Sequence, residues 1–292
     1  MNMMFICRAL AALSGLALGV GAQTAAVDPV EIIRKSVERD RMNSRRAKDY
    51  TFVQRVEERE FDKSGKVKKV ESNTFDVIMI GERPYSKKIA KDDKPLSEKE
   101  SRKVQEAFDK EIRKRQEESE SERKKRASEQ EKQREEGRRF LGEIPQAFDF
   151  KMVGEEKVEG HPVWVIDAKP RPGYKGTAKR WELLTKFRGR LWIDQKEYQW
   201  VRVEADTIAP VSFGWVLARL DPGAKLTFQQ ARVNSEIWLP VKATTRLNAR
   251  LALLKKLNGE FEVTWKDYKK FQTDSRMVNV AEGAGAEREQ LP

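Results

Sequence analysis

Few residues of this chain have the types and spacing that catalytic chemistry requires. His161 is the only histidine among 292 residues, and Cys7 is the only cysteine. Zinc sites need several such ligands, and serine hydrolases need a motif such as G-x-S-x-G, which the sequence does not contain. No glycine-rich phosphate loop follows a predicted strand. We therefore predict no catalytic residue, no metal site and no cofactor.

Carboxylates are abundant, and they leave one catalytic alternative open. The chain has 47 aspartates and glutamates, most of them among lysines and arginines in runs typical of solvated surfaces. Asp167 and Asp194 stand closest to apolar strand segments, and both fit strand ends or turns. A carboxylate-dependent hydrolase therefore ranks behind the binding functions considered below.

Aromatic side chains are the more informative group. All seven tryptophans lie between Trp164 and Trp265, in a region that alternates apolar and polar residues. Core packing accounts for most of them, but a surplus of aromatic and branched side chains also suits a concave site for acyl chains. The residues predicted to line this apolar concavity are Phe75, Val77, Trp164, Trp192, Val201, Val203, Phe213 and Trp238. Trp181, Leu184 and Phe187 fall in a row on a predicted short amphipathic helix over 178–187.

The elements that must position these residues are mainly short strands. Between Arg190 and Glu204, two strands flank a turn headed by Asp194, whose side chain can accept hydrogen bonds from the following backbone. Similar alternation predicts about ten antiparallel strands, beginning with a hairpin over 50–80. The dipeptide at 258–259, Asn-Gly, predicts another hairpin turn. A sheet of this length is expected to curl around its own apolar face.

Two helical segments accompany the strands. Residues 28–47 fit a helix capped by Asp28. Residues 97–140 form a charged arm that opens with a capping-box pattern and is rich in opposite charges three and four apart. Over 113–139 its only apolar residue is Ala127, so this part cannot bury a face. The arm either binds a partner or a lipid headgroup, or is a passive insertion.

The N-terminus and the net charge bear on location and partners. Residues 1–22 have an arginine, a short apolar run and then small residues, the pattern of a secretory signal. We expect an exported protein with one folded domain over 23–275 and a disordered tail over 276–292. The formal net charge of +12 favours anionic partners. For an exported protein, an anionic membrane surface or an envelope protein fits better than nucleic acid.

Four motifs together resemble the periplasmic LolA-like superfamily, the outer-membrane lipoprotein-sorting proteins and their relatives. They are Leu191–Lys196 (LWIDQK), Val201–Glu204 (VRVE), Ile237–Pro240 (IWLP) and Trp265–Phe271 (WKDYKKF). The resemblance covers about 28–271, interrupted by the charged arm, which has no counterpart in the family. It implies an α+β, mainly antiparallel fold: a half-open curved β-barrel with helices that cover its mouth as a lid. Trp181, Leu184 and Phe187, or the N-terminal helix, are the candidates for this lid.

The resemblance also implies a function. It implies a non-catalytic carrier in the periplasm of a diderm bacterium, with a lipid or a lipoprotein acyl chain as its ligand. No functional residue of the family can be placed on this sequence. An envelope interaction or sensor module on the same fold, binding a protein partner, remains the alternative.

Overall fold

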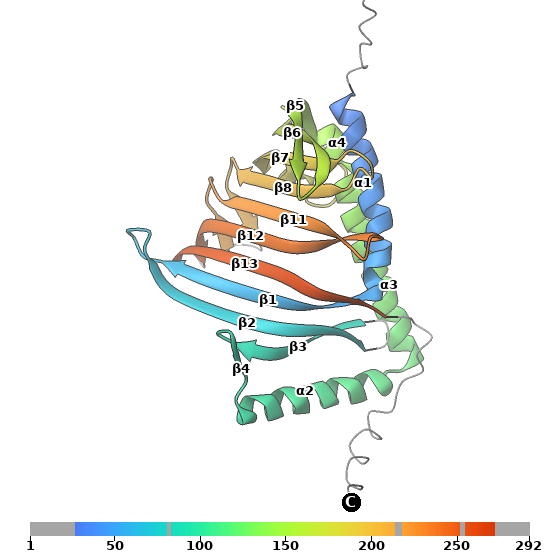
Figure 1. Cartoon of the computed structure of the whole chain (residues 1–292), viewed down its shortest axis with the longest axis vertical. Helices are drawn as coiled ribbons and strands as arrows, with labels where there is room; N and C mark the ends of the chain where they lie inside the picture. The colour runs from blue at the N-terminus through green and yellow to red at the C-terminus, as the bar shows by residue number, and fades with distance from the viewer. Residues whose placement is uncertain (1–26, 81–82, 214–217, 252–254, 272–292) are drawn as a thin grey trace, which may run out of the picture.

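A single antiparallel sheet forms the body of the molecule, and two helices run along the ends of its strands (Figure 1). The structure is a computed structural model that describes residues 27–80, 83–213, 218–251 and 255–271. The predicted signal segment 1–22 and the predicted tail 276–292 lie outside these residues. Along the sheet the strand order is β4-β3-β2-β1-β13-β12-β11-β8-β7-β6-β5. The sheet is not closed, as the prediction of a half-open barrel requires.

The strand boundaries follow the predicted alternation closely. The strands are β1 (Tyr50–Phe61), β2 (Val67–Ile80), β3 (Arg83–Lys91), β4 (Lys94–Pro95), β5 (Phe148–Val158), β6 (His161–Pro170), β7 (Phe187–Asp194), β8 (Trp200–Thr207), β9 (Val211–Phe213), β10 (Ala218–Leu220), β11 (Lys225–Val233), β12 (Ile237–Leu251) and β13 (Lys255–Lys270). The short β9 and β10 pair with each other, and β10 also pairs with β12.

The helices are α1 (Pro29–Arg46), η1 (Ala47–Asp49), α2 (Glu98–Gln116), α3 (Glu120–Gly142), α4 (Ile144–Ala147) and η2 (Trp181–Lys186), where η marks a 3₁₀ helix. The start of α1 is the predicted one, because the Asp28 carboxylate accepts a hydrogen bond from the Val30 backbone N–H at 2.9 Å. In the described part of the chain, no helix is both long enough and apolar enough to cross a membrane.

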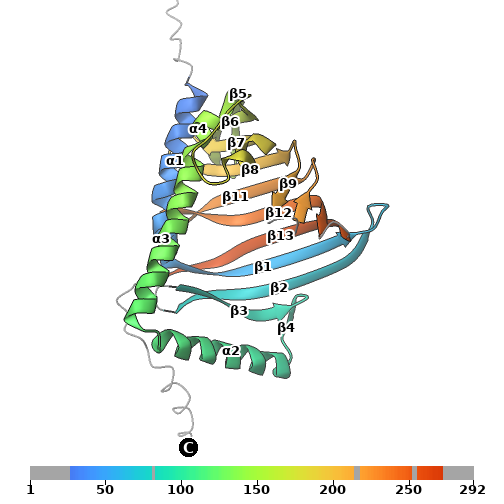
Figure 2. The same ribbon diagram turned by 180° about the vertical axis from the view of Figure 1, so that it is seen from behind.

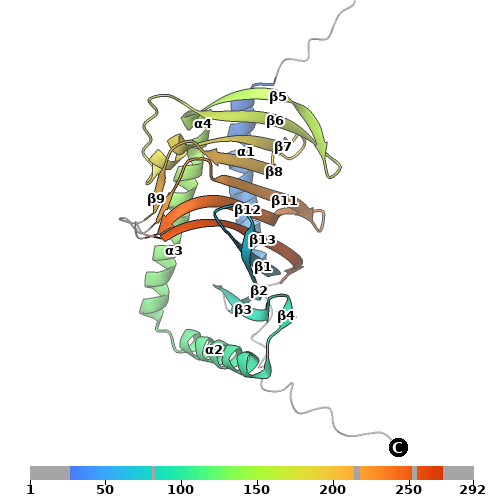
Figure 3. The ribbon, with the colours of Figure 1, turned by 90° about the vertical axis from the view of Figure 1, so that its left-hand side faces the viewer.

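The first and the last strand of the sheet in chain order lie side by side in its middle. The first strand, β1, pairs with the last, β13, so that Val56 lies opposite Val263. The hairpin of β1 and β2 thereby extends the sheet made by the C-terminal strands. Figure 3 shows the resulting curvature, with α2 beneath the β3–β4 edge and α3 standing opposite the sheet. We call the face on which α1 packs the inner face, and the opposite face the outer face.

The predicted charged arm is helical, and it consists of two helices. The break falls at Glu117–Ser119, and Figure 2 shows that α2 and α3 meet there at a sharp angle. Each helix opens with a capping box, Ser97 with Glu100 and Ser119 with Glu122. The second capping box lies within the predicted arm and marks where the chain must leave the first helix.

Two local predictions were wrong. Asn258 and Gly259 do not form a turn: both lie inside β13, opposite Asn248 and Leu247 of β12. Long pairing on both sides of β13 outweighs the local turn preference of the dipeptide. The predicted amphipathic helix over 178–187 is also shorter than expected, since only the 3₁₀ helix η2 forms and Phe187 already begins β7.

The turn between β7 and β8 confirms the predicted role of Asp194. Its carboxylate is 2% exposed and accepts hydrogen bonds from the backbone N–H groups of Lys196 at 2.9 Å and Glu197 at 2.5 Å. The second carboxylate oxygen lies 3.3 Å from Nδ1 of His161. The only histidine of the chain therefore lies beside the turn, with its ring centre 4.8 Å from that of Trp238.

Removing the Asp194 carboxylate should destabilise the protein. For Asp194→Ala we expect a loss of about 1–3 kcal/mol in the free energy of unfolding, because two backbone donors lose their acceptor in a buried place. Urea unfolding at neutral pH measures this. Asp194→Asn is the matched control, since its amide oxygen can still accept, and it should retain more of the stability. Equal losses in the two variants would contradict the assigned role.

Candidate functional site

The inner face carries an unbroken row of paired residues across nine strands. Each strand contributes one residue to this row, and that residue lies directly opposite the row residues of the neighbouring strands. From β5 to β2 the row is Met152, Ile166, Leu191, Val203, Phe228, Ala243, Val263, Val56 and Asn73. All of these residues except the last are apolar. An apolar row therefore crosses almost the whole width of the inner face, although Gln54 and Glu58 of β1 lie on the same face two residues to either side of Val56.

The outer face has the opposite character. One position away in every strand lies a second row, which points outward because side chains alternate along a strand. From β5 to β2 this row is Lys151, Asp167, Arg190, Glu204, Thr227, Thr244, Glu262, Glu57 and Ser72. Every one of these residues is polar. A hydrogen bond from Arg190, 2.6 Å from Asp167, keeps the pKa of that carboxyl below its usual range.

Helices cover only part of the apolar row. Ile32 and Ile33 of α1 are fully buried and pack in one cluster with Ile166 and Ile193. The same cluster includes residues of α4 and η2. On the packed side, the Trp200 indole N–H donates a hydrogen bond of 2.8 Å to the Ser36 hydroxyl of α1. The strands β5 to β8 are thus closed off by α1, α4 and η2 and form the core.

Where the strands approach η1, a second buried cluster contains Tyr50, Ile237 and Leu239. Apart from this cluster and the buried Val77, the inner face beyond β8 lies outside the buried clusters of the described structure. Beyond β8 the row residues Phe228, Ala243, Val263 and Val56 are only half-buried, and Leu226 is 38% exposed. Further aromatic side chains lie on the same face, as the strand alternation requires. We call this set the apolar inner surface: Phe52, Val56, Phe75, Leu226, Phe228, Phe261, Val263 and Trp265.

Four of the eight predicted lining residues lie on the inner face. Trp164 and Val203 belong to the covered part, while Phe75 and Val77 lie on β2 at its far side. The other predicted tryptophans lie elsewhere. The cluster on the outer face contains Trp192, Val201 and Trp238 together with Val163 and Val165. Phe213 ends β9, and its side chain lies outside the described part of the chain.

The outer-face cluster fixes its tryptophans by hydrogen bonds. The indole N–H of Trp192 donates to Glu156 at 3.0 Å, and that of Trp238 donates to Glu197 at 2.8 Å. The Trp192 ring also lies under the Arg202 guanidinium, 4.9 Å from its centre. Since successive residues of a strand point to opposite faces, these tryptophans and Trp164 cannot line one concavity. Hydrophobicity alone does not show which face of the sheet a side chain occupies, so the sequence predicts one concavity for residues that lie on both faces.

The candidate lid residues occupy three different environments. Leu184 is buried in the cluster beneath α1, and Phe187 is half-buried at the start of β7. Trp181 begins η2, and its ring packs edge-on against Tyr174 at 6.0 Å. The 3₁₀ helix η2 contacts α4, β6 and β7. It therefore covers the core side of the sheet and does not lie over the apolar inner surface.

Sequence reasoning missed most of the apolar inner surface. Phe52, Val56 and Phe228 lie in segments that were predicted to be strands, but no one segment shows which alternate residues face inward. The usable signal was the alternation itself, such as Phe261, Val263 and Trp265 at every second position. Combining it with strand pairing identifies the row, and pairing between β1 and β13 joins residues about 200 positions apart.

A buried glutamate fixes the proline-rich loop that follows β6. Glu143, between α3 and α4, is 8% exposed, and one of its carboxylate oxygens accepts three hydrogen bonds from this loop. The donors are the backbone N–H groups of Thr177 and Ala178, both at 2.6 Å, and the Thr177 hydroxyl at 3.0 Å. Burial acts to raise the pKa of Glu143, but these hydrogen bonds outweigh it and the pKa is lowered.

Gly176 allows the loop to approach the Glu143 carboxylate this closely. A Cβ atom at this position would lie 2.0 Å from a carboxylate oxygen of Glu143 and 2.6 Å from Cβ of Trp181. The loop therefore approaches the carboxylate as closely as a backbone without a side chain allows. In this way Glu143 connects the loop before η2 to the end of the charged arm.

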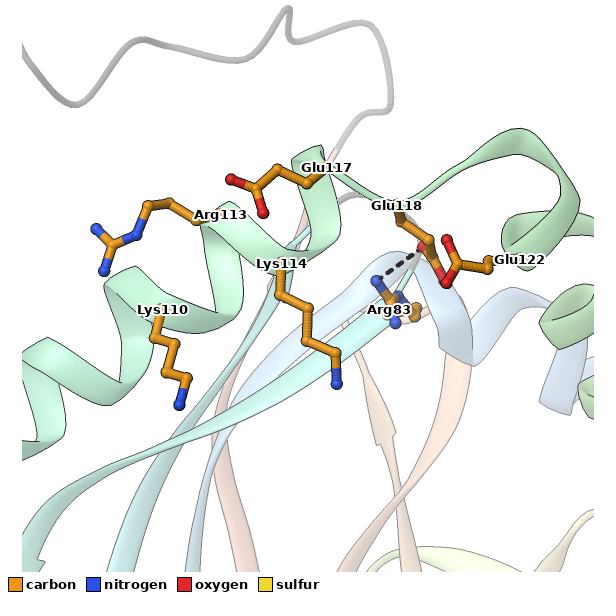
Figure 4. A pocket seen from close by; sticks show the side chains of 7 residues that line it. All are labelled: Arg83, Lys110, Arg113, Lys114, Glu117, Glu118 and Glu122. Carbon is orange, nitrogen blue, oxygen red and sulfur yellow. Dashed lines mark hydrogen bonds and ion pairs between the residues drawn. The ribbon is translucent and has the colours of Figure 1, made fainter.

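The bend between α2 and α3 is attached to the edge of the sheet. Arg83 of β3 lies 3.4 Å from Glu118 in the bend (Figure 4), and Arg126 of α3 pairs with the same carboxylate. Nη1 of Arg115 donates to the backbone carbonyls of Ile80 and Arg83 at 3.2 and 3.1 Å. The charged arm therefore leaves the sheet at a fixed point, although few of its residues are buried.

The pockets in the described structure have mainly charged linings. One lies at the α2–α3 bend, where Figure 4 shows Lys110 and Lys114 projecting beside Arg83. A second lies between α1 and α3. A third follows the charged rows of the outer face near Arg190 and Glu204. A fourth, at the start of α3, has Ile80, Ile112 and Ala127 in its lining beside charged side chains.

Among the described residues, no group of three or more histidine, cysteine, aspartate or glutamate side chains is arranged to hold a metal ion. The sites that remain are thus an apolar surface and charged clefts. An apolar surface can bind a ligand by burial, and a charged cleft can bind one by charge.

Comparison with known proteins gives matches only at the level of structure. No protein-family model matches the chain, and no curated protein matches it. A DUF1329 family protein from Desulfovibrio piger is 13% identical, with 83% of this chain and 93% of that chain covered and a TM-score of 0.31. A putative outer-membrane lipoprotein-sorting protein domain from Vibrio parahaemolyticus is 11% identical, with 84% and 95% covered and a TM-score of 0.29.

A LolA superfamily protein from Nitrosomonas europaea is also similar, at 9% identity, with 85% of this chain and 95% of that chain covered and a TM-score of 0.29. Because identity and TM-score are this low, the function is derived below from the residues of this chain.

Proposed function

We propose that the protein is a non-catalytic carrier that binds an acyl chain of a lipid or lipoprotein on its apolar inner surface. The observation that carries this proposal is the continuation of the apolar row beyond the part that α1 covers. Phe228 and Val263 belong to the same row as the buried Leu191 and Ile166, but they are only half-buried. A sheet that needs no ligand has no reason to keep these positions apolar.

The proposed driving force is burial of apolar surface. Covering an acyl chain contributes about 0.8 kcal/mol for each buried CH₂ group, and it requires no covalent step. Aromatic side chains such as Phe52, Phe261 and Trp265 offer large flat surfaces for such contacts. Of the residues predicted from the sequence, Phe75 belongs to the proposed site. Val77 lies buried beside it, and Trp164 and Val203 border it from the covered side.

The proposed setting is the cell envelope. It is supported by the signal-like pattern of residues 1–22 and by the polar row that crosses the outer face, which suits a protein that carries an apolar ligand through water. The alternative is an envelope interaction or sensor module that binds a protein partner on the same inner surface. Both alternatives use the open part of the row, and they differ in the chemistry of the ligand.

The two alternatives can be separated on the protein as it is made in cells. The protein is purified from the exported compartment and analysed by native mass spectrometry before and after lipid extraction. A carrier should show bound masses of lipid size that disappear on extraction. A preparation without any lipid-sized mass, and with a stoichiometric protein partner, would contradict the carrier and favour the interaction module.

A further inference from the structure

A basic cleft lies between α1 and α3, away from the apolar inner surface. It has a volume of about 640 Å³ and opens to solvent. Five basic side chains line it, three from α1 and η1 and two from the opposite helix: Arg41, Arg45, Lys48, Arg138 and Arg139. Two acidic side chains line it as well, Glu131 and Glu135 of α3.

The two carboxylates are already engaged by their own helix. Glu131 pairs with Arg138 at 2.7 Å and with Arg134 at 3.6 Å. Glu135 pairs with Arg139 at 2.6 Å. Neither carboxylate has an ion pair with α1 among the described contacts. The acidic charge of the cleft therefore neutralises the arginines of α3 and leaves the cations of α1 without a counterion.

The cations of α1 form one stripe. Arg41, Arg45 and Lys48 are spaced four and three residues apart, so they share a face of the helix and of the 3₁₀ turn that follows it. Within the described residues, none of the three side chains has a hydrogen bond or an ion pair. The helix dipole favours a cation near the end of α1. It does not account for a whole stripe that faces further arginines across a cleft.

We infer that this α1–α3 cleft is a binding site for a phosphate group, such as that of an anionic lipid headgroup. Arg41, Arg45 and Lys48 have no counterion among the described contacts, and they repel one another unless an anion lies beside them. Guanidinium groups match the oxygens of phosphate with paired hydrogen bonds, and they suit it better than a point charge does. Basic groups that approach from two sides fit a tetrahedral group, whereas a planar carboxylate offers oxygens in one plane only.

The site is distinct from the proposed acyl site but compatible with it. The stripe is on α1, the helix that covers the neighbouring part of the inner face. A lipid phosphate in the cleft would hold the protein at a membrane surface, or hold the headgroup of a bound lipid. Free inorganic phosphate has the same chemistry, so the two sources must be separated by experiment.

The test uses two variants with the same change of net charge. Arg41→Glu with Lys48→Glu alters the cleft, and Arg102→Glu with Lys103→Glu alters the exposed side of α2, where both residues lack a described ion pair. Partition into vesicles of phosphatidylglycerol and phosphatidylcholine is compared with partition into phosphatidylcholine alone. We expect the cleft variant to bind the anionic vesicles at least about tenfold more weakly than wild type, and the α2 variant to stay within about twofold.

The source of the phosphate is tested by titrating inorganic phosphate at constant ionic strength and following the arginine side-chain N–H signals by NMR. Saturating shifts in wild type and in the α2 variant, but not in the cleft variant, support the site. If these shifts occur without the vesicle effect, the site is supported with a soluble phosphate as its ligand. Equal loss of vesicle binding in both variants, with no saturating shift, would overturn it.

Two further controls keep the result interpretable. If the cleft variant does not fold, Arg41→Gln with Lys48→Gln replaces it, since these exposed positions tolerate a neutral polar residue. An uncharged monoacylglycerol is used as a second probe, because it can occupy the apolar inner surface without a phosphate. Its binding should be the same in wild type and in the cleft variant. If it fails to bind while phosphate still binds, the carrier proposal fails and the phosphate site stands.

Discussion

Replacing Phe228 with aspartate should weaken acyl-chain binding by at least about a hundredfold while the sheet stays folded. Phe228 lies in the middle of the apolar row and is only half-buried. In the free protein an aspartate there can still contact water. A bound acyl chain would remove that water, and an unpaired charge in an apolar environment costs several kcal/mol. Titration with a fluorescent fatty acid measures the effect.

The control is the next residue of the same strand. Gln229 points to the outer face, where it pairs with Arg202 and Lys242, so Gln229→Asp places the same charge among cations. Its binding should equal that of wild type, and thermal unfolding should show that both variants are folded. Equal binding by the Phe228→Asp variant and wild type would mean that the ligand does not contact this face.

Replacing Glu143 with alanine should cost about 2–4 kcal/mol of the free energy of unfolding. The carboxylate is almost fully buried and accepts two backbone hydrogen bonds and one from a hydroxyl. Removing it leaves these donors unsatisfied, at about 1–3 kcal/mol for a buried group. Gly176→Ala should destabilise the same contact from the other side, because the added methyl group overlaps the carboxylate. Chemical unfolding measures both variants.

The stability that Glu143 contributes should depend on pH. The pKa of Glu143 is lowered in the folded state from its usual 4.5, so the folded protein binds this proton less readily than the unfolded chain does. The contribution is complete above the unfolded pKa and is lost as the pH falls through the folded pKa. The stability difference between wild type and Glu143→Gln should therefore be larger at pH 7 than below pH about 4. An unchanged difference would contradict the assigned charge state.

The elements of this fold could be predicted because their signals are local. The helix that Asp28 caps, the strand at 148–158 and the Asp194 turn each follow from neighbouring residues. The positions that failed depend on distant partners. Asn258 and Gly259 form part of a strand only because β12 and β1 pair with β13 along its length. No local pattern contains that information.

The same distinction applies to the candidate site. That the chain has an apolar surface could be predicted from its aromatic residues, but which of them share it could not. Trp164 and Trp192 are similar in sequence context, yet they point to opposite faces. The face of each follows from the pairing of β6 with β7, in which Trp164 lies opposite Ile193 and Trp192 opposite Val165. The neighbouring β5–β6 and β7–β8 pairings each contain a bulge that shifts the register. A single irregularity of this kind moves a side chain from one face to the other.

The α1–α3 cleft could not be predicted from the sequence, because its two sides come from helices that are far apart in the chain. The charged arm was recognised as a candidate for binding headgroups, but its partner surface on α1 was not. Arg41 and Arg45 belong to the helix predicted over 28–47, and Lys48 follows it. Only the folded chain shows that these side chains line one cleft with Arg138 and Arg139.

The most direct test of the central claim uses a lipid whose acyl chain carries bromine, which quenches tryptophan fluorescence on contact. Trp265 lies on the apolar inner surface, and Trp192 lies in the outer-face cluster. If the acyl chain binds the inner surface, the brominated lipid should quench wild type, the quenching should fall strongly in Trp265→Phe, and it should persist in Trp192→Phe. Quenching that survives the loss of Trp265, or that disappears with the loss of Trp192, would contradict the account.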